Sequence, residues 1–206
     1  MTDREKQKIP DKLPMLEAFL DLHAGEQPLK GVTAILIQHQ LGSQVPMTEA
    51  LIRLGLGREQ IYWVDIPYSA NAKVRDALIA LGIPARNFSK SDYHVGKPYA
   101  AYQRGRVQKL FTDLQKKLGP SDRLLVLDDG SYFLEAMACY ALPKFRVHIV
   151  EQTTRGIIKL KRDATLQYYS KKFPVVNVAE SKPKKQLESP FIGKAVCVNS
   201  RTIKNF

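Results

Sequence analysis

The sequence predicts a three-layer α/β fold, in which a doubly wound, mostly parallel sheet lies between two layers of helices. Short apolar runs rich in branched residues, such as 32–38 (VTAILIQ) and 123–127 (RLLVL), are typical of strands buried on both faces. Segments of 10–20 residues with helical spacing of apolar residues separate these runs. Connections of this length between strands are right-handed crossovers, which make the strands parallel.

The expected elements follow in order along the chain. Strands are predicted at 32–38, 60–65, 84–88, 123–127, 146–150 and 175–178, and helices at 46–56, 71–81, 99–118, 134–141 and 153–169. Gly82 and the pair Gly119-Pro120 are helix stop signals, and Pro46 stands near a helix start. Residues 193–200 are a plausible closing strand. This order is Rossmann-like or flavodoxin-like.

Composition places the chain among ordinary globular proteins. Of 206 residues, 44% are hydrophobic and 25% charged, which excludes disordered, collagen-like and coiled-coil chains. No apolar run is long enough to span a bilayer and the N-terminus lacks an apolar leader, so we expect no membrane association and a cytoplasmic location. The two cysteines show neither metal spacing nor a disulfide framework. We divide the chain into an N-terminal helical extension (1–30), an α/β domain (31–193) and a basic C-terminal segment (194–206).

The positive charge is concentrated in the last part of the chain. Residues 151–206 hold twelve Lys/Arg and four Asp/Glu, so they carry +8 of the net +12. Such a bias suggests binding to phosphate, nucleic acid or an acidic partner, although a solvated face has the same composition. Tyr168 and Tyr169 beside Lys171 and Lys172 suit single-stranded nucleic acid, but the pattern is more typical of a helix end whose lysines face the helix dipole.

Parallel sheets bind ligands at the carboxyl ends of their strands, which directs attention to the loops that follow them. Asp128 and Asp129 directly follow the strand predicted at 123–127, and two interpretations are open: a ligand site, or a cap of the next helix. Thr153 opens the next helix with the same two alternatives. His39 follows the first predicted strand, and it is either an acid/base group or a residue whose hydrogen bonds are structural. His148, inside a strand pattern, is expected in the core.

The chain carries no recognisable nucleotide cradle. Gly55-Leu56-Gly57 resembles the start of a dinucleotide fingerprint, but it ends a helix and Gln60 stands at the third glycine position. Neither a phosphate-binding loop nor a zinc-protease, serine-hydrolase or CxxC motif occurs.

Five segments, taken in order, resemble the substrate domain of the adenosylhomocysteinase family. LDDGSYFLEAM is similar to a strand followed by DDGGDLT, VHIVEQTTRG to SEETTTG, and FPVVNVAESKPKKQLESPFIG to the family's INVNDS…K…KFDNxxG. Upstream, ILIQHQ resembles CLHMT, and VDIPYSANAKVRDALIALGIPA resembles the STQD…GIPV region. The likeness extends from about residue 32 to residue 193.

The resemblance implies reversible hydrolysis of S-adenosylhomocysteine to adenosine and homocysteine. In that family NAD oxidises the ribose 3′-hydroxyl, which acidifies the neighbouring C4′ proton so that homocysteine is eliminated. The implied catalytic residues are Asp129, His39, Lys184 and Glu188, and the implied substrate contacts are Gln152, Thr153, Ser69 and Asn71.

Several positions depart from the family pattern. Gln152 replaces a glutamate, and an amide can donate a hydrogen bond but cannot take a proton. Arg155 replaces a threonine, Gln40-Leu41 replaces Met-Thr, and Glu188 stands where the family has aspartate. The family continues into an NAD-binding domain, whereas this chain ends at Phe206. We therefore expect NAD to need a further domain.

The resulting hypothesis is a domain that binds an adenosine-type nucleoside and does not hydrolyse S-adenosylhomocysteine alone. It places Asp129, Gln152 and Thr153 near the sugar, which requires the turns after residues 127 and 150 to lie side by side. A separate cofactor-domain chain or a homo-oligomer is a possible partner. The alternative is a non-enzymatic binding module of the same fold, which contacts nucleic acid or an acidic partner through its basic C-terminal part.

Overall fold

A computed structural model describes residues 8–89, 91–93, 96, 98–138 and 142–188. The described strands are β1 (Val32–Gln38), β2 (Ile61–Asp65), β3 (Phe88–Ser89), β4 (Arg123–Asp128), β5 (Arg146–Glu151) and β6 (Val175–Asn177). They pair in parallel in the order β3-β2-β1-β4-β5-β6. The chain therefore builds outward from β1 in both directions, and strand order reverses between β1 and β4.

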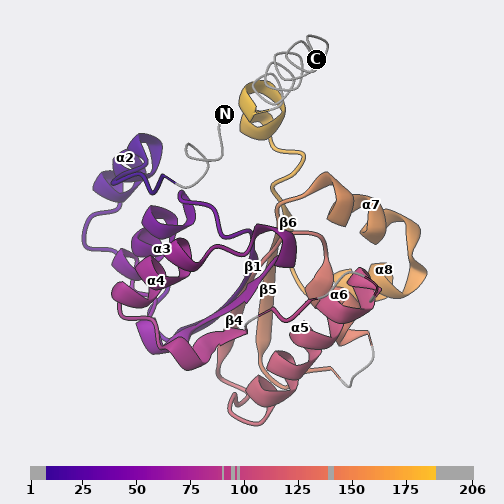
Figure 1. The fold of residues 1–206 in the computed structure, drawn as a ribbon. Helices are drawn as coiled ribbons and strands as arrows, with labels where there is room; N and C mark the ends of the chain where they lie inside the picture. The colour runs from indigo at the N-terminus through magenta and orange to yellow at the C-terminus, as the bar shows by residue number, and fades with distance from the viewer. Residues whose placement is uncertain (1–7, 90, 94–95, 97, 139–141, 189–206) are drawn as a thin grey trace.

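Helices connect the strands on both sides of this sheet. They are α2 (Pro14–Leu22), α3 (Gln44–Arg53), α4 (Ala72–Ala80), α5 (Tyr99–Gln115), α6 (Tyr132–Met137), α7 (Thr154–Arg162) and α8 (Ala164–Ser170). Short turns of 3-10 helix lie at η1 (Arg58–Gln60), η2 (Pro67–Ser69) and η3 (Ala85–Asn87), and a π-helical turn at η4 (Lys184–Glu188). Figure 1 shows α3 and α4 on one side of the strands and α5, α6 and α8 on the other.

Two apolar cores hold the layers together. Every residue of β1 is buried, which explains why its sequence shows no polar alternation. On one face, Ile35 and Val126 belong to a cluster with Phe111 of α5 and Phe133 of α6. On the other face, Leu36 and Trp63 pack with Val74 and Leu78 of α4. The three-layer, doubly wound prediction is confirmed.

Two predicted elements differ in detail. The helix expected over 153–169 is two helices, because Asp163 leaves the helical conformation and its carboxylate accepts the backbone N–H groups of Thr165 and Leu166. The strand expected over 84–88 is a 3-10 turn at Ala85–Asn87, and strand pairing begins only at Phe88.

The prediction of a core position for His148 is wrong. Exposure alternates along β5, so that Val147 and Ile149 are buried while Arg146 and His148 face solvent. Val176 on the neighbouring strand β6 is 57% exposed. One face of the sheet is thus open at this edge in the described part of the chain.

The chain ends give a partial test of the predicted boundaries. Helix α2 lies within the predicted N-terminal extension, whereas the closing strand at 193–200 and the basic segment at 194–206 lie outside the described residues. None of the described helices has the length and apolar character needed to cross a bilayer.

Candidate functional site

His39 and Asp129 face each other where the strand order reverses. They follow directly after β1 and β4, which are hydrogen-bonded neighbours with Ile37 paired to Asp128. Nε2 of His39 lies 3.5 Å from a carboxylate oxygen of Asp129, and the two side chains remain 26% and 21% exposed. The pair is therefore accessible at the position where open α/β sheets bind ligands.

Ser69 fixes the orientation of the His39 ring. Its hydroxyl lies 2.7 Å from Nδ1 of His39 and 3.0 Å from the carbonyl oxygen of Ile66. A carbonyl only accepts, so the single hydroxyl proton goes to Ile66 and the hydroxyl must accept from Nδ1–H. This arrangement leaves Nε2 as the nitrogen that can exchange a proton on the side of Asp129.

The environment of Asp129 combines burial with nearby cations. Burial raises the pKa of Asp129, while His39, Lys184 and Arg155 oppose that rise. Lys184 comes from η4, and its ammonium donates to the backbone carbonyl of Gln152 at 2.6 Å. The structure thus brings Asp129, His39, Lys184 and the backbone of Gln152 into one region.

The two adjacent aspartates have different roles. The carboxylate of Asp128 is fully buried and accepts the backbone N–H groups of Tyr132 at 3.1 Å and Phe133 at 2.8 Å. It therefore caps α6, while Asp129 turns toward His39. Burial, followed by the charge of Glu151, raises the pKa of Asp128.

Glu151 joins the turns that follow β4 and β5. One of its carboxylate oxygens accepts from the backbone N–H of Gly130 at 3.2 Å and from the N–H and hydroxyl of Thr153 at 2.8 and 2.6 Å. The other accepts from the N–H and hydroxyl of Ser131 at 2.8 and 3.0 Å. The two turns therefore lie side by side, as the nucleoside hypothesis requires.

Two of the remaining predicted site residues, Thr153 and Asn71, serve as helix caps. The hydroxyl of Thr153 donates to Glu151 and accepts the N–H of Gly156, so it caps α7. Asn71 caps α4 through its side-chain oxygen, which accepts the N–H groups of Lys73 and Val74. For Glu188 the structure describes the backbone, at the end of η4, and not the side chain.

A row of tyrosines beside His39 was missed in the sequence. Tyr68 is 72% exposed. The centre of its ring lies 5.3 Å from the centre of the His39 ring and 5.9 Å from that of the Tyr99 ring. Tyr99 in turn lies 6.4 Å from Tyr132, which opens α6. Burial raises the pKa of Tyr99 and of Tyr132, and the three rings form an aromatic row beside His39. Tyr68 lies in η2, and Tyr99 and Tyr132 are the first residues of α5 and α6. These positions in the sequence do not by themselves show that the rings meet.

The residues present do not fit a dinucleotide in this sheet, although its strand order is that of dinucleotide-binding domains. Between β1 and α3 there is one glycine, Gly42, and a Cβ there would lie 2.1 Å from the Lys8 carbonyl oxygen, so the N-terminal segment fills the space. The acid at the end of β2, Asp65, forms a buried ion pair with Arg106. The two positions that would hold a dinucleotide in this sheet are thus occupied by the protein's own groups.

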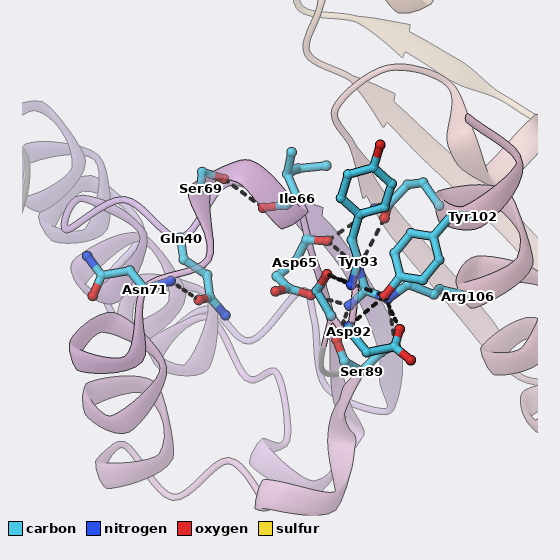
Figure 2. A network of polar contacts seen from close by, with 12 residues as sticks. Gln40, Asp65, Ile66, Ser69, Asn71, Ser89, Asp92, Tyr93, Tyr102 and Arg106 are labelled. Carbon is cyan, nitrogen blue, oxygen red and sulfur yellow. Dashed lines mark hydrogen bonds and ion pairs between the residues drawn. The ribbon is translucent and has the colours of Figure 1, made fainter. Parts of the chain in front are cut away.

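The Asp65–Arg106 pair anchors α5 to the carboxyl ends of β2 and β3 (Figure 2). The two side chains are 6% and 8% exposed. The Arg106 guanidinium also donates to the backbone carbonyl of Asp65 at 2.7 Å and to the backbone carbonyl of Ser89. Its hydrogen bonds are thus made within the protein, which identifies this network as structural.

Fold and site together define an α/β domain with a cluster of polar and aromatic side chains at its topological switch point. No known protein-family model matches the chain. Over 186 residues it is 30% identical to two uncharacterized proteins of Mycobacterium tuberculosis, one from strain CDC 1551 and one from strain H37Rv. The alignment covers 89% of this chain and 35% of each relative, so the chain spans about a third of the length of these proteins.

Proposed function

We propose that this domain binds an adenosine-type nucleoside in the crevice between β1 and β4. The observation that carries the proposal is the contact of His39 with Asp129 beside the exposed Tyr68 ring. A carboxylate accepts hydrogen bonds from sugar hydroxyls, and an exposed aromatic ring offers a stacking surface for a base. The sequence resemblance to adenosylhomocysteinase favours a nucleoside among such ligands.

In this proposal each residue of the crevice has one task. Asp129 accepts a hydrogen bond from one sugar hydroxyl, and Nε2 of His39 accepts a hydrogen bond from another. Ser69 is a positioning residue that acts through the His39 ring, and Lys184 supplies positive charge near Asp129. Gln152 donates or accepts hydrogen bonds without changing charge.

Titration of the purified protein with adenosine tests the proposal. We expect saturable binding that Asp129→Ala weakens by more than tenfold, about 1.4 kcal/mol, because a charged acceptor is lost. Asp113→Ala is the matched control, since this aspartate lies on α5 with its side chain 53% exposed. Absence of binding, or unchanged affinity in a folded Asp129→Ala protein, would contradict the proposal.

A second measurement concerns turnover. The sheet does not fit a dinucleotide, so we expect no release of homocysteine from S-adenosylhomocysteine by this chain, with or without added NAD. Release that scales with protein concentration would show that the chain is an enzyme by itself.

The alternative of a nucleic-acid or acidic-partner module is favoured by the concentration of positive charge after residue 150. At the end of α8, Tyr168 is 52% exposed and the Lys172 ammonium lies 5.2 Å from its ring centre. An exposed ring with an adjacent cation is a feature of sites that bind single-stranded nucleic acid.

A further inference from the structure

A second cavity lies on the other half of the carboxyl edge of the sheet. Its volume is about 310 Å³, and it lies at the ends of β2 and β3 and at the start of α4. Its wall includes Gln40, Asp65, Asn71, Arg75, Phe88 and Ser89. Neither His39 nor Asp129 lines it, so it is distinct from the proposed nucleoside crevice.

The Gln40 side chain presents a hydrogen-bond donor to this cavity. Its oxygen accepts the backbone N–H of Asn71 at 2.5 Å, and a backbone N–H can only donate, so this contact fixes which amide atom is oxygen. The NH₂ group consequently turns away from Asn71, as Figure 2 shows. Gln40 is only 5% exposed, and its NH₂ group has no hydrogen-bond partner among the described residues. This nitrogen is not one of the fully buried atoms that lack a partner in the described part of the chain, so an acceptor that enters the cavity can reach it.

The balance of charge around the cavity is positive. Asp65 is the one carboxylate among the described lining residues, and Arg106 neutralises it. Arg75 pairs only loosely, at 3.5 Å, with Asp76, whose side chain is 68% exposed. Such exposed pairs contribute little, so the guanidinium remains able to meet a second anion. The N-terminus of α4 adds a partial positive charge on the same side.

We propose that this cavity binds the carboxylate of a small organic acid. One guanidinium and neutral amide donors match a single negative charge, whereas the second charge of a phosphate dianion would have no cationic partner among the described lining residues. Ala70, Ala72 and Phe88 supply an apolar wall for a short hydrocarbon chain. The volume is at the small end of ligand sites. This proposal does not depend on nucleoside binding in the neighbouring crevice.

Calorimetric titration of the whole chain with butyrate tests the proposal, with butyramide as the neutral analogue and inorganic phosphate as the other anion. We expect saturable butyrate binding that is at least about tenfold tighter than binding of either control. No saturable butyrate binding up to tens of millimolar, equal binding of butyramide, or tighter binding of phosphate would overturn it.

Two variants locate the binding. Gln40→Glu keeps an acceptor for the Asn71 N–H and replaces the NH₂ group by a charged oxygen, so butyrate affinity should fall by about tenfold or more. Arg75→Gln should have an equal effect, while Lys73→Gln, an exposed change on the same helix, should have none. Retained affinity in both site variants would overturn the assignment. Adenosine titration of Arg75→Gln, which should be unaffected, separates this result from the nucleoside proposal.

Discussion

Burial and nearby positive charges have opposite effects on the pKa of Asp129. Burial raises its pKa, and the charges of His39, Lys184 and Arg155 offset only part of that rise. The folded protein therefore holds this proton more tightly than the unfolded chain does. The contribution of protonated Asp129 to stability is complete at pH values below about 3.8, the pKa in the unfolded chain. It is lost as the pH rises through the higher pKa of the folded protein.

The substitution Asp129→Asn tests whether the ionisation of Asp129 lowers the stability of the protein. As the pH rises from about 3.8, the natural protein loses stability because Asp129 ionises in a buried place, and the variant has no such charge. We therefore expect the free energy of unfolding of the variant, minus that of the natural protein, to increase with pH. Urea unfolding at a series of pH values measures the difference. Glu180→Gln is a control of opposite sign, since contacts with Lys161 and Asn177 lower the pKa of Glu180. A difference for Asp129→Asn that stays constant or falls with pH would refute the argument.

Ser69 offers a second test at a single residue. Its hydroxyl accepts from Nδ1–H of His39, so neutral His39 should be protonated on Nδ1 in the natural protein. In Ser69→Ala that preference should be lost, which nitrogen chemical shifts of the ring report directly. Ser43→Ala is the control, because the Ser43 side chain makes no helix-capping hydrogen bond. An unchanged tautomer in Ser69→Ala would remove its positioning role.

The start of α7 lies against the carboxyl end of β5. A Cβ at Gly156 would lie 2.2 Å from the carboxyl carbon of Glu151, so this glycine lets the helix start approach the buried carboxylate. The same carboxylate bonds the turns after β4 and β5. The position of α7 is thus linked to that of Asp129 through one side chain.

Gly156→Ala should therefore destabilise the protein by about 2 kcal/mol or more, because the methyl group displaces a hydrogen-bonded buried carboxylate. Gly105→Ala, in the exposed part of α5 with open space at its Cβ, should instead stabilise by roughly 0.5–1 kcal/mol. Chemical denaturation of both variants measures the contrast. Equal effects of the two substitutions would show that Glu151 can move aside at little cost.

The elements also show how far the sequence could lead. The strands were predictable from apolar runs, and the carboxyl-edge loops of β1 and β4 followed from the parallel sheet, which brought His39 and Asp129 forward. The row of Tyr68, Tyr99 and Tyr132 was not predictable, because its rings meet only after the strand order is known. The break at Asp163 was missed because helical spacing of apolar residues continues across it.

The roles of the hydroxyl groups show the same limit. A threonine at a helix start is more often a cap than a ligand contact, and the sequence left both roles open for Thr153. The partners of Thr153 in the structure, Glu151 and the N–H of Gly156, show that its hydroxyl serves both the turn and the cap. Long-range contacts of this kind depend on a buried residue of another element, which local spacing does not report.

For the whole molecule, the net charge of +12 gives a way to separate the two functional hypotheses. A neutral nucleoside in the crevice displaces no condensed counterions, so its affinity should not depend on salt. A single-stranded RNA on the basic surface releases counterions from each neutralised phosphate, so its affinity should fall steeply.

We therefore expect the adenosine dissociation constant to change by less than about twofold between roughly 50 and 200 mM salt, while any RNA affinity falls by at least about tenfold. Replacing Lys171 and Lys172 by Gln should weaken RNA binding and leave adenosine binding unchanged, since both lysines are exposed at the end of α8. Titrations of both ligands at the two salt concentrations measure this. Tight, salt-sensitive RNA binding without adenosine binding would favour the binding-module alternative, because only a polyanion gains from charge spread over the whole surface.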